Sequence, residues 1–280
     1  GVEIIVVNDG DSTLEVPADL VNQIAYFENP GKGVSYARNF GVEKSSGELL
    51  FFIDDDMWIN TNAIDWIRTY IFSQENKEAV YFLNWVYPED LQESLSKSKI
   101  GRYLLDVNYH TLWGRLHKTG KAPVSGLQLF DFVGSCSLVI SRKVFDKIGG
   151  YNKKMIFQGE DADLADKLNR ITVPIYLVFD VTLQHNHADR LELDNFLKRI
   201  YDGFGSEYNA LKAGIQLPLG HISYAGFKRH IFEMCRRTEK YWIILLNILP
   251  NGAAFTPINN RLIGALGGLQ RYKQWKRIIE

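Results

Sequence analysis

The feature that most constrains the fold is an unbroken apolar run that ends in three aspartates. Leu49-Leu50-Phe51-Phe52-Ile53 is followed directly by Asp54-Asp55-Asp56. Such a run is typical of a strand that is buried on both faces of a sheet. Further strand patterns occur at 3–7, 23–27, 80–86, 137–140 and 175–179, and helical patterns occur at 34–44, 61–72, 141–148 and 161–169. This alternation predicts an α/β fold with a mostly parallel sheet.

The last third of the chain changes character and predicts three long helices, at 191–211, 230–249 and 261–280. From residue 190 onward there are 14 Lys and Arg against 7 Asp and Glu, whereas the preceding part is acidic. We therefore expect a catalytic domain at 1–190 and a basic helical extension at 191–280.

The basic helical segments have two explanations. Residues 228–240 and 261–277 mix Lys and Arg with aromatic and aliphatic residues, which suits peripheral contact with an anionic membrane surface. The alternative, equally open at this point, is a helical subdomain whose apolar face packs on the catalytic domain and whose charges are solvated.

Composition excludes several classes of protein. With 46% hydrophobic and 23% charged residues, the chain is neither disordered nor fibrous. The two cysteines, Cys136 and Cys235, are far apart, so we expect no disulfide framework, no thiolate zinc site and a reducing compartment, the cytoplasm. No signal peptide is visible, and the apolar run at 241–249 is too short to span a bilayer. No nucleic-acid motif is present, so we expect no nucleic-acid partner.

The three aspartates suggest a metal site. Adjacent carboxylates repel one another, and open α/β sheets bind ligands at the carboxyl ends of their strands. A Mg²⁺ or Mn²⁺ ion that bridges a substrate diphosphate would relieve this repulsion. An acidic turn after a core strand explains the same residues, so this motif alone does not decide.

Two further motifs carry groups that could do chemistry. Gly159-Glu160-Asp161-Ala162-Asp163 offers carboxylates for a general base, although acidic residues at a helix start more often just complement the helix dipole. His185-Asn186-His187 could supply a metal ligand, although a solvated pair of loop histidines is the commoner case. Gly31-Lys32-Gly33 lacks the spacing of a phosphate loop and is interpreted as a turn.

Taken together, these stretches resemble the motifs of family 2 glycosyltransferases of the GT-A type, in the family's order over about residues 3–190. Residues 6–12 resemble its strand and Asp-Gly-Ser turn, and 31–41, with Ala37-Arg38-Asn39, resemble its glycine–ARN helix. The strand of its D-x-D motif, its Gly-Gly-aromatic motif and its ED-x-DL motif are matched at 47–56, 145–151 and 159–164. The resemblance implies a GT-A-like (Rossmann-like) sheet flanked by helices, with a C-terminal helical extension.

The resemblance also implies a function. The chain would be a metal-dependent, inverting transferase that moves a sugar from a nucleotide-diphosphate sugar, UDP-sugar first, to a hydroxyl of a glycan or lipid-linked acceptor. Asp161 would be the general base, while Glu160 and Asp163 would support it, one by orienting the acceptor and one by capping the helix.

Donor and metal ligands follow from the same resemblance. Asp9 would contact the nucleobase and Arg38 the base or the diphosphate, with Asp54 and Asp55 also on the donor. The ligands of Mn²⁺ or Mg²⁺ would be Asp56, Asp54 and His185, with His187 in reserve.

One departure from the family pattern is that the sequence starts at what resembles the family's second strand. A catalytically silent module that binds nucleotide or glycan, or that scaffolds a partner enzyme, is therefore the main alternative. A nucleotidyltransferase is less favoured, because the glycine-rich phosphate loop expected near its N-terminus is missing.

Overall fold

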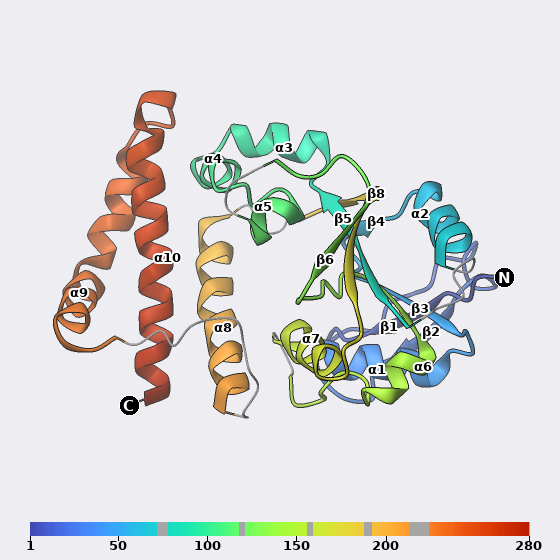
Figure 1. Cartoon of the computed structure of the whole chain (residues 1–280). Coiled ribbons are helices and arrows are strands. Elements are labelled where there is room, and N and C mark those ends of the chain that lie inside the picture. The colour runs from blue at the N-terminus through green and yellow to red at the C-terminus, as the bar shows by residue number, and fades with distance from the viewer. Residues whose placement is uncertain (72–77, 118–120, 156–158, 188–191, 213–223, 280) are drawn as a thin grey trace.

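The computed structural model describes residues 1–71, 78–117, 121–155, 159–187, 192–212 and 224–279. Figure 1 shows an α/β body with three long helices stacked along one side of it. The strands are β1 (Ile5–Asn8), β2 (Ala25–Glu28), β3 (Leu49–Ile53), β4 (Met57–Trp58), β5 (Val80–Val86), β6 (Leu127–Phe130), β7 (Ser137–Ser141) and β8 (Ile175–His185). The helices of the body are α1 (Val34–Lys44), α2 (Thr61–Trp66) with the π-helical turn η1 (Ile67–Ile71), α3 (Glu89–Ser96), α4 (Lys99–Asp106), α5 (Leu112–Leu116), α6 (Arg142–Lys147) and α7 (Glu160–Arg170). The long helices are α8 (Leu193–Lys212), α9 (Gly226–Ile248) and α10 (Thr256–Ile279), with the short 3-10 turn η3 (Ala253–Phe255) before α10.

The main sheet is mixed rather than mostly parallel. Its strands lie in the order β3-β7-β5-β8-β4, with β6 also paired to β8, and β1 and β2 form a separate parallel pair. Within the main sheet only β5 and β8 are parallel, while the other described pairs are antiparallel. The α/β class is confirmed, but the expected strand direction was wrong. An apolar run reports burial on both faces and carries no information on the direction of the strand.

This topology gathers several chain segments at one edge of the sheet. β3, β5 and β8 all end there, and the antiparallel β7 begins there, because Ile53 pairs with Ser137. The Asp54 N–H donates to the Cys136 carbonyl at 3.4 Å, which joins the two segments just beyond the strands. β8 is eleven residues long, more than twice the predicted 175–179, and so it carries the chain to His185 at the same edge.

Most predicted elements are present with small shifts in their ends. Asn60, and not Thr61, caps α2, because the Asn60 side chain accepts from the Ala63 N–H at 3.0 Å. Phe72, where that helix was expected to end, lies outside the described residues, as does the predicted domain boundary at 190/191. The division into two domains stays a prediction.

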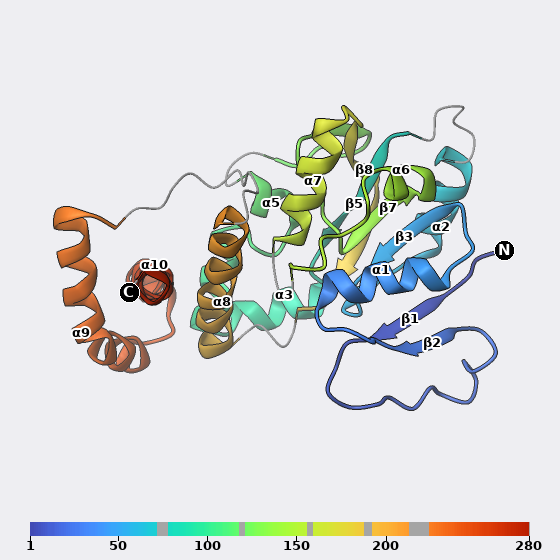
Figure 2. The same ribbon diagram turned by 90° about the horizontal axis from the view of Figure 1, so that it is seen from below.

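The C-terminal helices share the core of the body. α10 lies against α8, α9 and α4, and Figure 2 shows it end-on between α8 and α9. Its apolar residues Ile263, Leu266, Leu269 and Tyr272 are completely buried, and Leu246 of α9 is buried as well. For residues 261–277, the packing explanation is therefore the one that fits.

Two further expectations can be compared with the fold. Cys136 and Cys235 are both free thiols, as expected. Within the described part of the chain, no helix combines the length and the apolar character needed to cross a membrane.

Candidate active site

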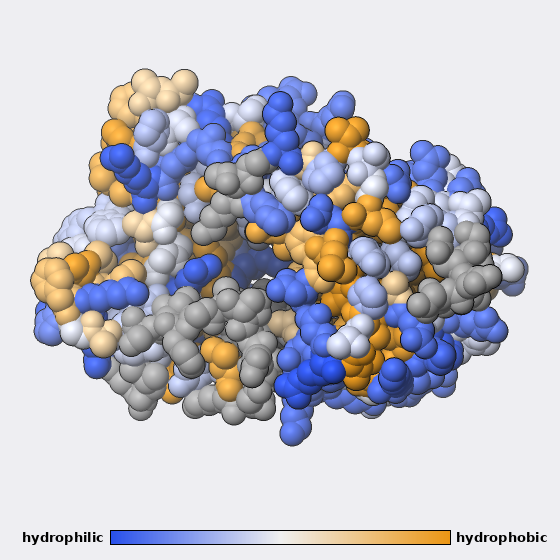
Figure 3. Space-filling view, in the orientation of Figure 1, coloured by the Kyte–Doolittle hydropathy of each residue, from blue (hydrophilic) through white to orange (hydrophobic). Residues whose placement is uncertain are grey.

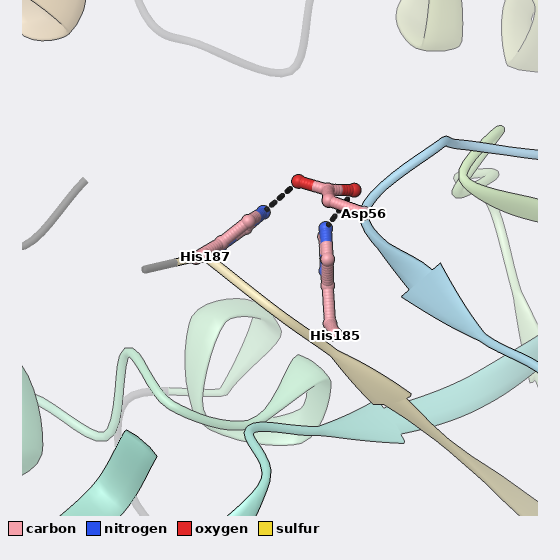
Figure 4. A group of neighbouring side chains, drawn as sticks. All are labelled: Asp56, His185 and His187. Carbon is pink, nitrogen blue, oxygen red and sulfur yellow. Dashed lines mark hydrogen bonds and ion pairs between the residues drawn. The ribbon is translucent and has the colours of Figure 1, made fainter. Parts of the chain in front are cut away.

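Three side chains from two strand ends form a cluster of metal-binding groups, shown in Figure 4. Asp56 follows β3, His185 ends β8, and His187 lies two residues further on. His185 Nε2 lies 2.9 Å from Asp56 Oδ1, and His187 Nε2 lies 3.4 Å from Asp56 Oδ2. Both histidines are buried and the carboxylate is half-buried. The predicted first choice and the predicted reserve thus lie together on one carboxylate.

Aromatic and cationic groups surround His187. Its Nδ1 lies 2.8 Å from the Tyr87 hydroxyl and 2.9 Å from an Arg115 nitrogen, which also donates to that hydroxyl. The Arg115 guanidinium is held over the rings of Tyr109 and Trp85, at 3.8 and 4.5 Å from their centroids. Packing of this kind fixes the orientation of a ligand ring before any ion binds.

The donor set fits a divalent cation. One ligand atom from each of Asp56, His185 and His187 lies within 4.8 Å of the others. Two imidazoles and one carboxylate suit a transition-metal ion such as Mn²⁺ better than Mg²⁺, which prefers an all-oxygen shell. Asp54, which was predicted to be a ligand, is not part of this cluster.

Asp54 belongs instead to a second cluster, centred on Arg38 of α1. Arg38 donates to Asp54 Oδ1 at 2.8 Å and to Glu160 Oε1 at 3.1 Å, and its guanidinium lies 5.3 Å from the Tyr151 ring centroid. Burial alone would lower the pKa of Arg38, but Tyr151 and the surrounding carboxylates raise it above its usual value. Arg38 is therefore a permanent cation that is already bound to two carboxylates.

Asp161 lies beside this arginine, at the start of α7. Gly159 precedes the helix with φ 96°, a left-handed conformation that favours glycine and lets Glu160 and Asp161 enter at the first turn. Asp161 Oδ1 accepts from the Ser135 N–H at 3.1 Å. Burial, followed by the charge of Glu160, raises the pKa of Asp161 to about 7, against the opposing effects of Arg38 and the Ser135 hydrogen bond. A carboxylate with such a pKa can take up a proton near neutral pH.

Asp163 has a structural environment. It is buried, forms an ion pair with Lys167 at 2.8 Å and accepts from Asn152 at 3.4 Å. No side chain caps α7 at its N-cap, Gly159, so the expectation that either Glu160 or Asp163 caps the helix was wrong. Asp163 instead ties the helix to the loop that follows α6.

The two remaining predicted donor residues lie apart from these clusters. Asp9, just after β1, accepts from the Gly33 N–H at 3.0 Å and from Asn29 at 2.6 Å. These bonds join the end of β1 to the start of α1, where Gly33 has φ 91°. Asp55 is exposed and belongs to neither cluster.

Sequence reasoning missed the residues that support the site. Tyr87 follows directly after the predicted strand 80–86, so its place at the carboxyl edge could have been inferred. Arg115 lies in α5, which Thr111 caps by accepting from the Gly114 N–H; that capping threonine was the available signal. Tyr151 is the aromatic residue of the Gly-Gly-aromatic motif at 145–151, from which no role in the site was predicted. Ser135 carries no comparable local signal, because its role depends on a contact with α7.

Comparison with known proteins adds a family match. A family model described as "Glycosyl transferase family 2" matches residues 1–149, more than half of the chain. An uncharacterized glycosyltransferase of Rickettsia felis is 27% identical over 180 residues, which cover 62% of this chain and 27% of that protein. Glycosyltransferase GlyA of Streptococcus pneumoniae is 36% identical over 69 residues, which cover 23% of this chain and 10% of that protein. The matched regions thus span 27% or less of the length of these relatives.

Solved structures with a related backbone are more distant. GalNAc-T7 with UDP, GalNAc and Mn²⁺ has 14% identity and a TM-score of 0.47, over 85% of this chain and 48% of that one. Mannosyltransferase PcManGT from Pyrobaculum calidifontis, in complex with GDP-Man and Mn²⁺, has 12% identity and the same TM-score of 0.47, over 98% of this chain and 77% of that one. Both likenesses are too distant to assign any residue of the present site.

Proposed function

The chain belongs to glycosyl transferase family 2, and on that premise we propose that it moves a sugar from a nucleotide-diphosphate sugar to a hydroxyl of a glycan or lipid-linked acceptor. The observation that carries the proposal is Asp161, a carboxylate with a raised pKa at the sheet edge that also bears the Asp56, His185 and His187 cluster. A UDP-sugar is the favoured donor.

Asp161 is the proposed general base. Its carboxylate takes the proton of the acceptor hydroxyl as the hydroxyl oxygen forms a bond to the anomeric carbon. The bond between that carbon and the diphosphate oxygen breaks, and the nucleoside diphosphate leaves with the electron pair. Attack in line with the leaving group inverts the anomeric configuration. A base whose pKa lies near 7 is well matched to this task at neutral pH.

Asp56, His185 and His187 are the proposed ligands of a divalent cation, Mn²⁺ in preference to Mg²⁺. When bound, this ion would offset the negative charge on the leaving diphosphate. Tyr87 and Arg115, through their contacts with His187 Nδ1, keep the His187 ring oriented toward the carboxylate of Asp56.

Arg38 has a different proposed role from the one expected. Because it is already bound to Asp54 and Glu160, we assign it to positioning these carboxylates beside Asp161 rather than to holding the diphosphate. Asp9 is kept as the proposed contact to the nucleobase, with Asp54 and Asp55 nearer the ribose. The Gly33 N–H and Asn29 already hold the Asp9 carboxylate in place.

The direct test is calorimetric titration of UDP into the protein with Mn²⁺ and, separately, with EDTA. We expect binding that needs both Mn²⁺ and Asp56, so that Asp56→Ala abolishes it. Asp65→Ala, which removes an exposed carboxylate from α2, is the matched control and should bind like the unmodified chain.

Three results would contradict parts of this assignment. Equal UDP affinity with Mn²⁺ and with EDTA would remove the metal from donor binding. Metal-dependent binding of GDP but not of UDP would replace the favoured nucleotide. Metal-dependent UDP binding without transfer to any glycan or lipid-linked hydroxyl would support the silent binding module instead.

A further inference from the structure

Helix α9 presents an apolar stripe to solvent along its whole length. Apolar side chains of one face are exposed in both halves of the helix, from 81% for Phe227 and 74% for Ile248 to 40% for Ile231, with the half-buried Thr238 between Met234 and Tyr241. The apolar members of this stripe are Phe227, Ile231, Met234, Tyr241, Ile244, Leu245 and Ile248. At a rise of about 1.5 Å per residue, a stripe over 22 residues is roughly 32 Å long. Exposed apolar surface of this extent marks an interaction site.

The stripe is not the face by which α9 holds to the rest of the chain. A different face carries Leu246, which belongs to the main core, and Phe232 and Cys235, which pack on the Tyr224, Leu269 and Tyr272 cluster. Helix α9 therefore has two apolar faces, and among the residues that the structure describes, α10 and the body cover one of them.

Basic side chains border the exposed stripe. Lys228, Arg229, Arg236, Arg237 and Lys240 are all exposed, and His230 is exposed as well. The acidic residues of the helix, Glu233 and Glu239, are half-buried and pair with Lys276 and Lys273 of α10. Glu233 also pairs with Arg236 at 2.5 Å and lies 4.0 Å from Arg237, so it offsets part of the positive charge of the helix. Figure 3 shows hydrophobic and hydrophilic atoms side by side over α9, at the left edge of the molecule. The outward surface of α9 is thus apolar and positively charged, and its acidic groups lie on the inner side.

We propose that α9 docks flat on a lipid surface with anionic headgroups. Its apolar stripe would enter the boundary between headgroups and acyl chains, while the basic side chains reach the headgroups. Anionic lipids attract each nearby Lys or Arg, so the charge and the apolar stripe act together. The helix lies on the bilayer and does not cross it.

A second copy of the chain fits this surface less well. Pairing two α9 stripes in parallel would bring Arg237 and Lys240 of one copy beside the same residues of the other. Like charges along the seam of two helices oppose their association. Charge complementarity therefore favours an anionic lipid surface over self-association.

Docking would place the proposed transferase where a hydroxyl carried by a lipid is the acceptor. This consequence rests on the proposed function, whereas the docking itself does not. A vesicle measurement needs neither nucleotide nor turnover, so failure of docking and failure of UDP binding are distinguishable.

The test is co-sedimentation of the full chain with vesicles of phosphatidylcholine alone and of phosphatidylcholine mixed with phosphatidylglycerol. We expect binding to the mixed vesicles, with much weaker binding to the neutral ones and a decline as salt rises. Phe227→Ser combined with Ile248→Ser should weaken binding about tenfold or more, because two apolar side chains no longer enter the bilayer. A separate variant, Arg237→Glu combined with Lys240→Glu, should weaken binding to the anionic vesicles and leave binding to the neutral vesicles unchanged.

The matched control removes exposed apolar groups elsewhere. Val124→Ser combined with Leu129→Ser changes side chains that are 96% and 64% exposed, outside α9, and should leave binding unchanged. Absence of sedimentation with any vesicle, or equal sedimentation of the α9 variants, would overturn the proposal. A dimer seen by sedimentation equilibrium and lost in the Phe227→Ser, Ile248→Ser variant would assign the stripe to a second copy instead.

Discussion

The Arg38 cluster and the Asp56 cluster, both at the edge of the sheet where β3 and β8 end, balance their carboxylates with different partners. Around Arg38, the chain supplies its own permanent cation, which bonds to Asp54 and Glu160 and lies beside Asp161. Around Asp56, the partners are His185 and His187, which carry a full charge only when protonated. The carboxylates around the proposed base are therefore balanced by a side chain of the protein itself, Arg38. The cluster proposed to face the leaving diphosphate is instead suited to bind a metal ion from solution.

The largest expected effect concerns the base in the arginine cluster. Asp161→Asn should lower the rate of transfer by about 10²–10⁴-fold, because the amide cannot accept the acceptor's proton. Binding of UDP with Mn²⁺ should be unchanged, since the histidine cluster is intact. In the unmodified chain, kcat/KM should rise with pH through about 7, as Asp161 loses its proton. Transfer assays with matched calorimetry measure both quantities, and retained turnover would refute the role.

The next largest effect is on stability, and it tests whether Arg38 stabilises the carboxylates that it contacts. Arg38→Met should lower the free energy of unfolding by about 3–5 kcal/mol, because it leaves partly buried carboxylates without their counterion. Urea unfolding measures the loss. Arg68→Met, an exposed change in η1, serves as the control and should shift stability by less than about 0.5 kcal/mol. If the two variants were equally stable, Arg38 would not hold the cluster together.

Substitutions in the histidine cluster should change the affinity for Mn²⁺ more than they change the stability of the fold. His185→Ala and His187→Ala should each weaken Mn²⁺ binding by about a hundredfold, because each removes a ligand from the set of three. Asp54→Asn should leave Mn²⁺ affinity nearly unchanged, since its carboxylate is bound to Arg38. Titration followed by calorimetry or Mn²⁺ electron paramagnetic resonance measures the affinities. A large loss in Asp54→Asn would join the two clusters into one metal site.

A smaller effect links the raised pKa to stability. A carboxylate whose folded pKa is raised contributes stability that is present below its unfolded pKa of about 3.8 and is lost as pH rises through about 7. Asp161→Asn escapes this loss, which accrues between pH 3.8 and about 7, so its melting temperature relative to that of the unmodified chain should be a few degrees higher at pH 8 than at pH 4. Thermal unfolding at both pH values measures the difference. A constant difference would show that Asp161 does not titrate in this range.

The smallest expected effect concerns the support of His187. Tyr87→Phe removes the hydroxyl that lies 2.8 Å from His187 Nδ1, a loss worth about 1 kcal/mol or roughly fivefold in Mn²⁺ affinity. Tyr26→Phe removes a hydroxyl from β2, outside both clusters, and provides a control. Equal Mn²⁺ affinity in Tyr87→Phe and the unmodified chain would show that the Tyr87 hydroxyl is not needed to orient the His187 ring.

Local patterns were enough to predict the elements that frame the site. The run 49–53 and the helix 34–44 appear with the expected ends, because continuous burial and helical spacing are properties of short segments. The direction of β7 could not be predicted, since pairing partners lie far apart in the chain. The expectation of a mostly parallel sheet came from the alternation of strands and helices, which does not fix how each strand pairs.

The site was predicted in its residue types but only partly in its grouping. Asp56 and His185 were expected together and lie together, while His187 was held in reserve, because two residues at a spacing of two share one side only in an extended segment. The extension of β8 to His185 brings both histidines to Asp56. Asp54 was expected to bind the metal, but its carboxylate accepts a hydrogen bond from Arg38 of α1 instead. This contact depends on tertiary packing and could not be predicted from local sequence.

Two contacts at the carboxyl end of α9 have a mechanical consequence. Lys99 of α4 donates to the carbonyl of Leu246, and Arg102 of α4 donates to the carbonyl of Asn251 at 2.7 Å. These bonds clamp the carboxyl end of α9 to the α/β body, and cations at that end also complement the helix dipole. A helix held in this way keeps a fixed orientation relative to the α/β body. On a bilayer it would set both the height and the tilt of the sheet edge, so only acceptors whose hydroxyl stands at that height would be glycosylated.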